Sequence, residues 1–309
     1  MNKFRLLFCI LLISSSTFAT DHFWIGGAGN WSNTLNWSYT SGGPNGASVP
    51  GVSDNAIFDA SSGLAAGDLV TIDVPAIMND LNFSGVPISF VFASPLLVTF
   101  EVQGSIIGNA NGVTFNGTWG EIKMNTALTG EVITSLATTW IQDFRFSGEQ
   151  VSIADDFNIG AGKIHVDAGG IDVNNITVTC SEFHSITTEI RDIDITNTIF
   201  NVTDGLWQVD NTSSSLVWTA SGSSITLGDN LTIAQFDGGN LSYDTLYSST
   251  ATEFRHYGNN SFDLLSVVTS SQFKIENGTT LSTDSLVAGG VCGAPLFLST
   301  TVSPGASAI

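Results

Sequence analysis

Short runs of alternating apolar and polar residues, separated by turn residues, fill the chain from Asp68 onward. Such runs include the segments 69–74, 88–92, 97–102, 140–146 and 272–275. A period of two, together with enrichment in β-branched and aromatic residues, is typical of β-strands. Turn-forming dipeptides such as Asn111-Gly112 and Asn277-Gly278 separate the runs, and no segment after residue 19 keeps helical periodicity for three turns. The sequence therefore predicts an all-β protein.

The number and spacing of the strands favour one architecture. About one strand every ten residues over the whole of 68–309 is long for a single sandwich. The segment 81–85 (LNFSG) is echoed by 144–148 (FRFSG) 63 residues later, the length of three coils of about 21 residues. Stacked coils bury their inward faces on their neighbours. We therefore predict a right-handed parallel β-helix (a β-solenoid) over residues 68–309, with stacked β-sandwiches as the alternative.

The first 19 residues have the features of a secretory signal peptide. Lys3 and Arg5 precede an unbroken apolar run over residues 6–13, and Thr17-Phe18-Ala19 is an acceptable cleavage site. A membrane-spanning helix needs roughly 20 apolar residues, and this run is far shorter. We expect cleavage near Ala19, a mature chain without a membrane span, and a location outside the cell or on its surface.

Residues 20–67 are rich in Trp, Gly, Asn and Ser, and they predict an N-terminal cap. Trp24, Trp31 and Trp37 lie within 14 residues of one another. The open end of a solenoid exposes unpaired strand edges and apolar core. A loop held by three packed tryptophans would cover that end. The alternative is an aromatic platform on which sugar rings stack.

Residues 24–59 also carry a specific pattern: W-x-G-G-x-G-N-W-S, followed by N-W, V-P and D-N-A-x-F-D. It resembles the opening of large secreted repetitive surface proteins of Bacteroidetes, many of which look like adhesins. Residues 258–265 (GNNSFDLL) and 292–309 resemble elements found near the other end of such proteins. The resemblance implies secretion and β-helical repeats, and it implies no particular ligand. Because these proteins usually continue to a sorting domain, we expect the repeat region 68–309 to be truncated at its C-terminus.

The charge balance limits the partners. The chain has 28 Asp and Glu against 8 Lys and Arg, a formal net charge of −20. Neutralising the phosphates of a nucleic acid requires a basic face, so nucleic-acid binding is excluded. Extracellular glycans and other surface proteins remain as expected partners.

Asp192 and Asp194 are the best-placed catalytic candidates. In the run 190–195 they fall on one face of a strand, roughly 6.5–7 Å apart from the strand rise alone. That separation suits the paired carboxylates of sugar hydrolysis. It equally suits an ordinary solvated strand face, which is the interpretation we favour. His165 and Asp167 also share a strand face and predict a surface pair, and no nucleophile motif surrounds a serine.

Metal and thiol chemistry have weaker signals. Asp155, Asp156 and Asp237 lie in turn-like segments that could supply oxygen ligands to calcium, although no EF-hand loop is present. Cys180 and Cys292 remain after signal cleavage and could form one disulfide or stay as two buried thiols. We favour the thiols, and we expect no obligatory cofactor.

Taken together, these features predict a secreted, non-enzymatic surface or extracellular-matrix protein with an adhesin-like β-helical scaffold. Two alternatives stay open: a polysaccharide lyase or hydrolase built on the same scaffold, and a glycan-binding module.

Overall fold

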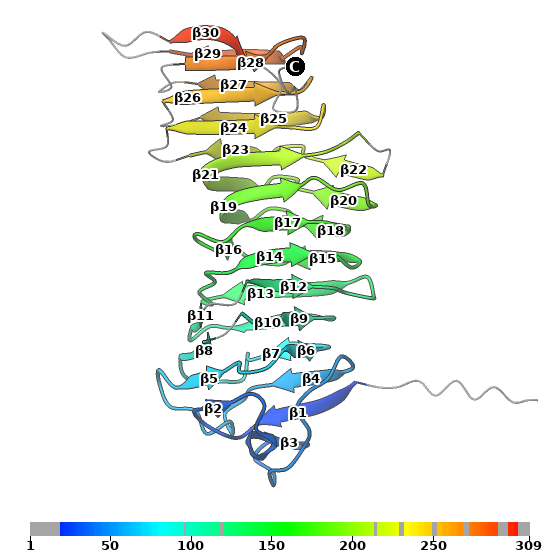
Figure 1. Cartoon of the computed structure of the whole chain (residues 1–309), viewed down its shortest axis with the longest axis vertical. Coiled ribbons are helices and arrows are strands. Elements are labelled where there is room, and N and C mark those ends of the chain that lie inside the picture. Colours follow the sequence, from blue (N-terminus) through cyan, green and yellow to red (C-terminus); the bar gives the residue numbers. More distant parts are fainter. Residues whose placement is uncertain are drawn as a thin grey trace, which may run out of the picture.

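The computed structural model describes residues 19–95, 97–117, 120–212, 215–228, 232–248, 252–267, 272–289 and 296–301. The chain is all-β and forms a β-solenoid of about 10 turns, whose parallel strands stack along one long axis (Figure 1). The prediction of a β-helix is confirmed, and the stacked-sandwich alternative is wrong. Within the described ranges no helix is long and apolar enough to cross a membrane. The predicted signal segment 1–18 and Cys292 lie outside these ranges.

Three sheets build the solenoid, and one short 3-10 turn, η1 (Thr34–Asn36), lies near its first end. The ten-stranded sheet contains, in spatial order, β3 (Trp37–Ser38), β1 (Thr20–Trp24), β4 (Asp54–Ile57), β7 (Leu81–Asn82), β10 (Ile106–Asn109), β13 (Glu131–Leu136), β15 (Gln150–Ile153), β18 (Gly169–Asp172), β20 (Arg191–Asp194) and β22 (Leu216–Thr219). The four-stranded sheet contains β2 (Gly29–Asn30), β5 (Leu69–Thr71), β8 (Phe90–Ser94) and β11 (Val113–Gly117).

The sixteen-stranded sheet has one long path and several branches. The path contains β6 (Ala76–Met78), β9 (Phe100–Val102), β12 (Glu121–Met124), β14 (Asp143–Phe146), β17 (Ile164–Val166), β19 (Thr177–Ser185), β21 (Ile199–Val209), β23 (Ser224–Leu227), β25 (Ser242–Ser248), β27 (Ser261–Val267) and β29 (Ser282–Ala288). The branches contain β16 (Phe157–Asn158), β24 (Ile233–Asp237), β26 (Glu253–Tyr257), β28 (Gln272–Glu276) and β30 (Phe297–Thr301).

The cross-section of the solenoid changes along its axis. The long strands β19 and β21 each serve two faces, because a register shift between Cys180 and Glu182 bends the pair. The first half of β21 pairs with β23 and the second half with β24. The ten-stranded sheet stops at β22, and the described coils beyond β24 contain two strands each: β25 with β26, β27 with β28, and β29 with β30. The solenoid therefore loses one of its faces at β22.

The sequence echo that suggested coils of equal length is not a structural repeat. Leu81 lies in β7 of the ten-stranded sheet, whereas Phe144 lies in β14 of the sixteen-stranded sheet. The two similar sequence segments therefore belong to strands on different faces of the solenoid.

A continuous apolar core runs through the stacked coils. Alternate residues of most strands point inward, as the period-two pattern predicts. Aromatic rings stack from coil to coil: the ring centroids of Phe92 and Phe115 are 4.8 Å apart, and those of Phe115 and Trp140 are 4.4 Å apart. These spacings match the distance between neighbouring strands, so each ring packs on the one in the next coil.

The three N-terminal tryptophans close the first end of this core. Trp24, Trp31 and Trp37 are all fully buried. The ring of Trp37 packs edge-on against both others, with centroids 5.1 Å from Trp24 and 4.8 Å from Trp31. The Trp37 indole N–H donates to the Trp31 carbonyl at 2.9 Å. Fully buried rings present no face to a sugar, so these three residues do not form an aromatic platform.

Candidate functional site

Asp192 and Asp194 lie on the outward side of β20, both only partly exposed. Asp172 of β18 stands at the register position of Asp194. Burial, followed by the charges of Asp194 and Asp172, raises the pKa of Asp192. One oxygen of Asp194 accepts hydrogen bonds from the backbone N–H and the hydroxyl of Thr196, at 3.0 and 2.6 Å. The two carboxylates therefore share a strand face, and one of them also holds a turn.

The three calcium candidates do not come together. Asp155 accepts from the backbone N–H groups of Ser135 and Leu136, each at 2.6 Å, and Asp156 accepts from that of Thr177 at 2.8 Å. Both aspartates therefore fasten one coil to a neighbouring coil. Within the described part of the chain, no group of three or more His, Cys, Asp or Glu side chains is placed to hold a metal ion.

Asp237 lies apart from that pair, at the end of β24 in the sixteen-stranded sheet. Burial raises the pKa of its carboxyl against a lowering hydrogen bond from Gly239, and the charges of Glu276 and Asp210 raise it further.

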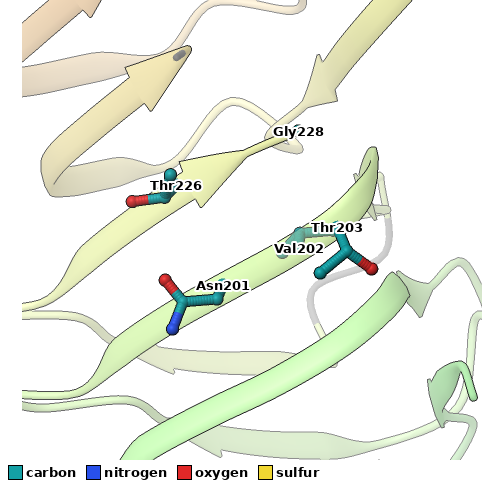
Figure 2. A pocket seen from close by; sticks show the side chains of 5 residues that line it. All are labelled: Asn201, Val202, Thr203, Thr226 and Gly228. Carbon is teal, nitrogen blue, oxygen red and sulfur yellow. The ribbon is translucent and has the colours of Figure 1, made fainter. Parts of the chain in front are cut away.

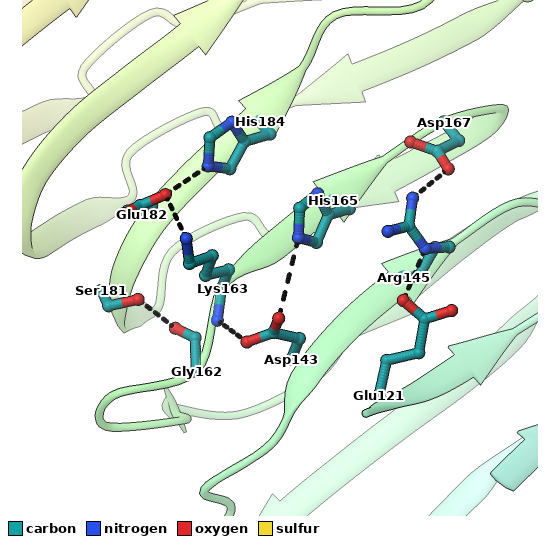
Figure 3. A network of polar contacts seen from close by, with 10 residues as sticks. All are labelled: Glu121, Asp143, Arg145, Gly162, Lys163, His165, Asp167, Ser181, Glu182 and His184. Atoms are coloured by element: carbon teal, nitrogen blue, oxygen red, sulfur yellow. Dashed lines mark hydrogen bonds and ion pairs between the residues drawn. The ribbon is translucent and has the colours of Figure 1, made fainter. Parts of the chain in front are cut away.

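The outward side of the sixteen-stranded sheet carries five of the six basic residues that come after the signal segment. We call these residues the basic row; they are Lys123, Arg145, Lys163, Arg255 and Lys274. Figure 3 shows two of them, Arg145 and Lys163, with their carboxylate partners. The sixth, Arg191, is fully buried in β20 of the other large sheet. This segregation leaves the outward side of the ten-stranded sheet without a described Lys or Arg that reaches solvent.

Each member of the basic row is paired with a carboxylate. Arg145 bridges Glu121, at 2.7 Å, and Asp167. Although burial opposes it, these two hydrogen bonds raise the pKa of Arg145. Lys163 lies 2.8 Å from Glu182. The remaining pairs are Lys123 with Glu101 at 3.7 Å, Lys274 with Glu253 at 2.7 Å, and Arg255 with Glu253.

Two histidines stack within this surface. His165 of β17 and His184 of β19 face each other in register, with ring centroids 5.0 Å apart and planes 11° from parallel. Burial lowers the pKa of His165, and the positive charge of Arg145 lowers it further. His184 Nε2 lies 2.6 Å from a carboxylate oxygen of Glu182.

The predicted surface pair of His165 with Asp167 is not what the structure shows. The carboxylate of Asp167 bonds Arg145 instead, and the carboxylate nearest to His165 Nε2 is that of Asp143, at 3.9 Å. Register across the coils decides this, because Arg145 occupies the position next to His165 on β14.

The hollows between described residues lie open on the surface and include volumes from about 110 to about 560 Å³. One of about 110 Å³ lies over β21 and β23 and is lined by Asn201, Val202, Thr203, Thr226 and Gly228 (Figure 2). None of these lining residues has a titratable side chain. A second hollow of about 360 Å³ lies where the ten-stranded sheet stops, and Trp218 lines it. The short run 216–219 alternates as a strand does, and nothing in its sequence marks Trp218 as a surface residue.

Cys180 is a buried free thiol, and burial raises its pKa. A thiol that stays protonated is unreactive, so Cys180 fills core volume.

No known family model matches the chain, and no curated protein or solved structure is similar to it. The function therefore has to be inferred from the chain's own residues and fold.

Proposed function

We propose that this protein is a secreted, non-enzymatic scaffold of the cell surface or extracellular matrix, an adhesin-like β-helix whose side faces bind other surface molecules. The observation that carries the proposal is that the basic side chains lie along one sheet face and are each paired with a carboxylate. The basic row is paired with carboxylates along a sheet face, and these pairs join neighbouring coils. Partly exposed ion pairs of this kind contribute about 0–1 kcal/mol each, and they neutralise the charges of this face two by two.

The signal-like N-terminus and the resemblance to secreted surface proteins support the same function. The single core that runs through the coils also supports it, because an elongated adhesive module has to hold its side faces in a fixed relation.

A polysaccharide-active enzyme is the second candidate, and one observation favours it. Asp192 has a raised pKa beside Asp194, which is how a general acid and an ionised partner are distinguished in glycosidases. Against this, both carboxylates project from one strand of a sheet face, and neither lines the hollows over β21 and β23 or at Trp218.

One paired experiment tests the proposal. Beads coated with the purified exported chain are applied to immobilised extracellular polysaccharides and matrix proteins. The same preparation is screened for release of reducing ends and of unsaturated products from neutral and acidic polysaccharides. We expect adhesion without product release. Product release that Asp192→Asn abolishes and Asp172→Asn spares would establish the enzyme, and absence of adhesion to every surface would also refute the scaffold function.

A further inference from the structure

The place where the ten-stranded sheet stops forms a ledge on the side of the solenoid. β22 is its last strand, and among the described strands it pairs with β20 alone. In Figure 1 the next coils, with β25 and β27, follow higher up the axis, and β25 pairs with β23 and not with β22. The hollow at this ledge is lined by Trp218, Thr219, Ala220, Ser221, Ser242, Tyr243, Asp244 and Asp263.

Trp218 is the one described tryptophan that is not buried. The other five, Trp24, Trp31, Trp37, Trp140 and Trp207, are at most 1 % exposed, whereas Trp218 is partly exposed. Its indole N–H donates to the Ser242 carbonyl at 3.0 Å. Its ring packs edge-on against Tyr243, with centroids 5.0 Å apart. The ring is thus held in one orientation while part of it stays open to the hollow.

The rim of the hollow is polar and has fixed acceptors. Asp244 accepts from the backbone N–H of Gly222 at 2.8 Å and from the hydroxyl of Thr245 at 3.2 Å, which orients its carboxylate. Asp263 is exposed on the neighbouring strand β27, and Ser221 and Ser242 are exposed as well. No described Lys or Arg lines the hollow.

The geometry points to a subsite for a neutral saccharide ring at Trp218. A pyranose has an apolar C–H face that packs on an aromatic ring, and its hydroxyls donate to carboxylate oxygens in charge-assisted hydrogen bonds. A volume of about 360 Å³ lies at the lower end of the range for small-ligand sites. Uronic or sulfated sugars carry negative charge, which Asp244 and Asp263 repel. This inference rests on the proposed function, because it assigns a ligand class to the scaffold.

Affinity electrophoresis of the exported chain in gels that contain laminarin, xylan, galactomannan or polygalacturonate tests the subsite. We expect a neutral polysaccharide to retard the wild-type chain and polygalacturonate to leave it unretarded. Trp218→Ala should weaken binding at least about ten-fold, Trp218→Phe about two- to three-fold and Asp263→Asn about three-fold. Val217→Ala is the matched control, because Val217 is exposed on the same strand and lies outside the hollow.

Several results would overturn the subsite. These are the absence of retardation by every neutral polysaccharide, a preference for polygalacturonate, and unchanged binding by a folded Trp218→Ala chain. If Trp218→Ala does not fold, unchanged binding by both Trp218→Phe and Asp263→Asn decides against it. If beads coated with Trp218→Ala adhere as well as wild type, the subsite is refuted and the scaffold function stands. If the wild-type chain depolymerises a polysaccharide, the scaffold function is refuted and the subsite stands.

Discussion

Replacement of Trp31 by alanine tests whether the tryptophan cluster stabilises the first end of the solenoid. Truncating a buried Trp costs about 3–5 kcal/mol. The edge-on contact with Trp37, at 4.8 Å, adds about 1 kcal/mol. The indole N–H of Trp31 has no hydrogen-bond partner among the described residues. Its removal therefore stabilises the folded chain by about 1–3 kcal/mol and offsets part of the loss. The expected net loss is about 3 kcal/mol, or on the order of 8 °C in melting temperature for a chain of this size.

Calorimetry measures the melting temperature, and hydrogen exchange locates the loss. Coils of a solenoid contact only their neighbours, so amides of β1 and β4 should lose protection first while β25 and β27 keep theirs. Leu35→Ala is the matched control, because Leu35 lies in the same segment and is 58 % exposed. It should change stability by no more than about 0.5 kcal/mol. A Trp31→Ala chain that melts within about 2 °C of wild type would refute this account of the cap.

Three further predictions concern individual buried groups. Burial lowers the pKa of His256 to about 4, so below pH 6.5 its side chain is protonated in the unfolded chain before it is protonated in the folded chain. The free energy of unfolding should therefore fall by up to about 3 kcal/mol between pH 6.5 and 4. Thermal melts should show a smaller fall in His256→Gln. Gly170→Ala should lower the free energy of unfolding in urea by about 3 kcal/mol or more, because a Cβ there would lie 1.8 Å from the Asp192 carbonyl oxygen. Gly130→Ala is the control and should cost less, because Gly130 also has a positive φ but no atom lies close to its Cβ position. Arg191→Met should cost about 3–5 kcal/mol by the same measurement, because it removes the four hydrogen bonds that the buried guanidinium donates to three carbonyls and the Ser185 hydroxyl. A cost below about 1 kcal/mol would contradict this.

The fold class could be predicted because a solenoid strand has a local signature. Inward residues such as Ile164 and Val166 alternate with outward residues such as His165, and that pattern is readable within one strand. The length of a coil is not local. Ile106 pairs with Ile133, 27 residues on, whereas Leu246 pairs with Leu265, 19 residues on. Loops of variable length at the corners absorb the difference, so no fixed repeat exists in the sequence for a period search to find.

The same variability explains which polar residues could be placed from the sequence. The alternation correctly predicts Asp192 and Asp194 on one strand face, because both belong to one strand. The pairing of Arg145 with Glu121 joins residues 24 positions apart, and that of Lys163 with Glu182 joins residues 19 apart. Such pairs depend on register between coils. In the sequence the six Lys and Arg residues that come after the signal segment are scattered, and only the stacking shows that five of them share one face.

The ledge at Trp218 depends on where the ten-stranded sheet ends, which the local sequence does not indicate. Leu216–Thr219 has the same alternation as the strands before it, and nothing within it shows that the ten-stranded sheet stops there. The change is visible only in the later part of the solenoid, where coils of two strands succeed β23 and β24. In the two-strand coils Tyr243 and Phe262 close the exposed side of the core, with rings 5.7 Å apart. A tryptophan beside that closure is left partly exposed because the strand that would have covered it is absent from the described coil above. The proposed saccharide subsite would therefore follow from where a face of the solenoid ends, and no single residue of the sequence marks that end.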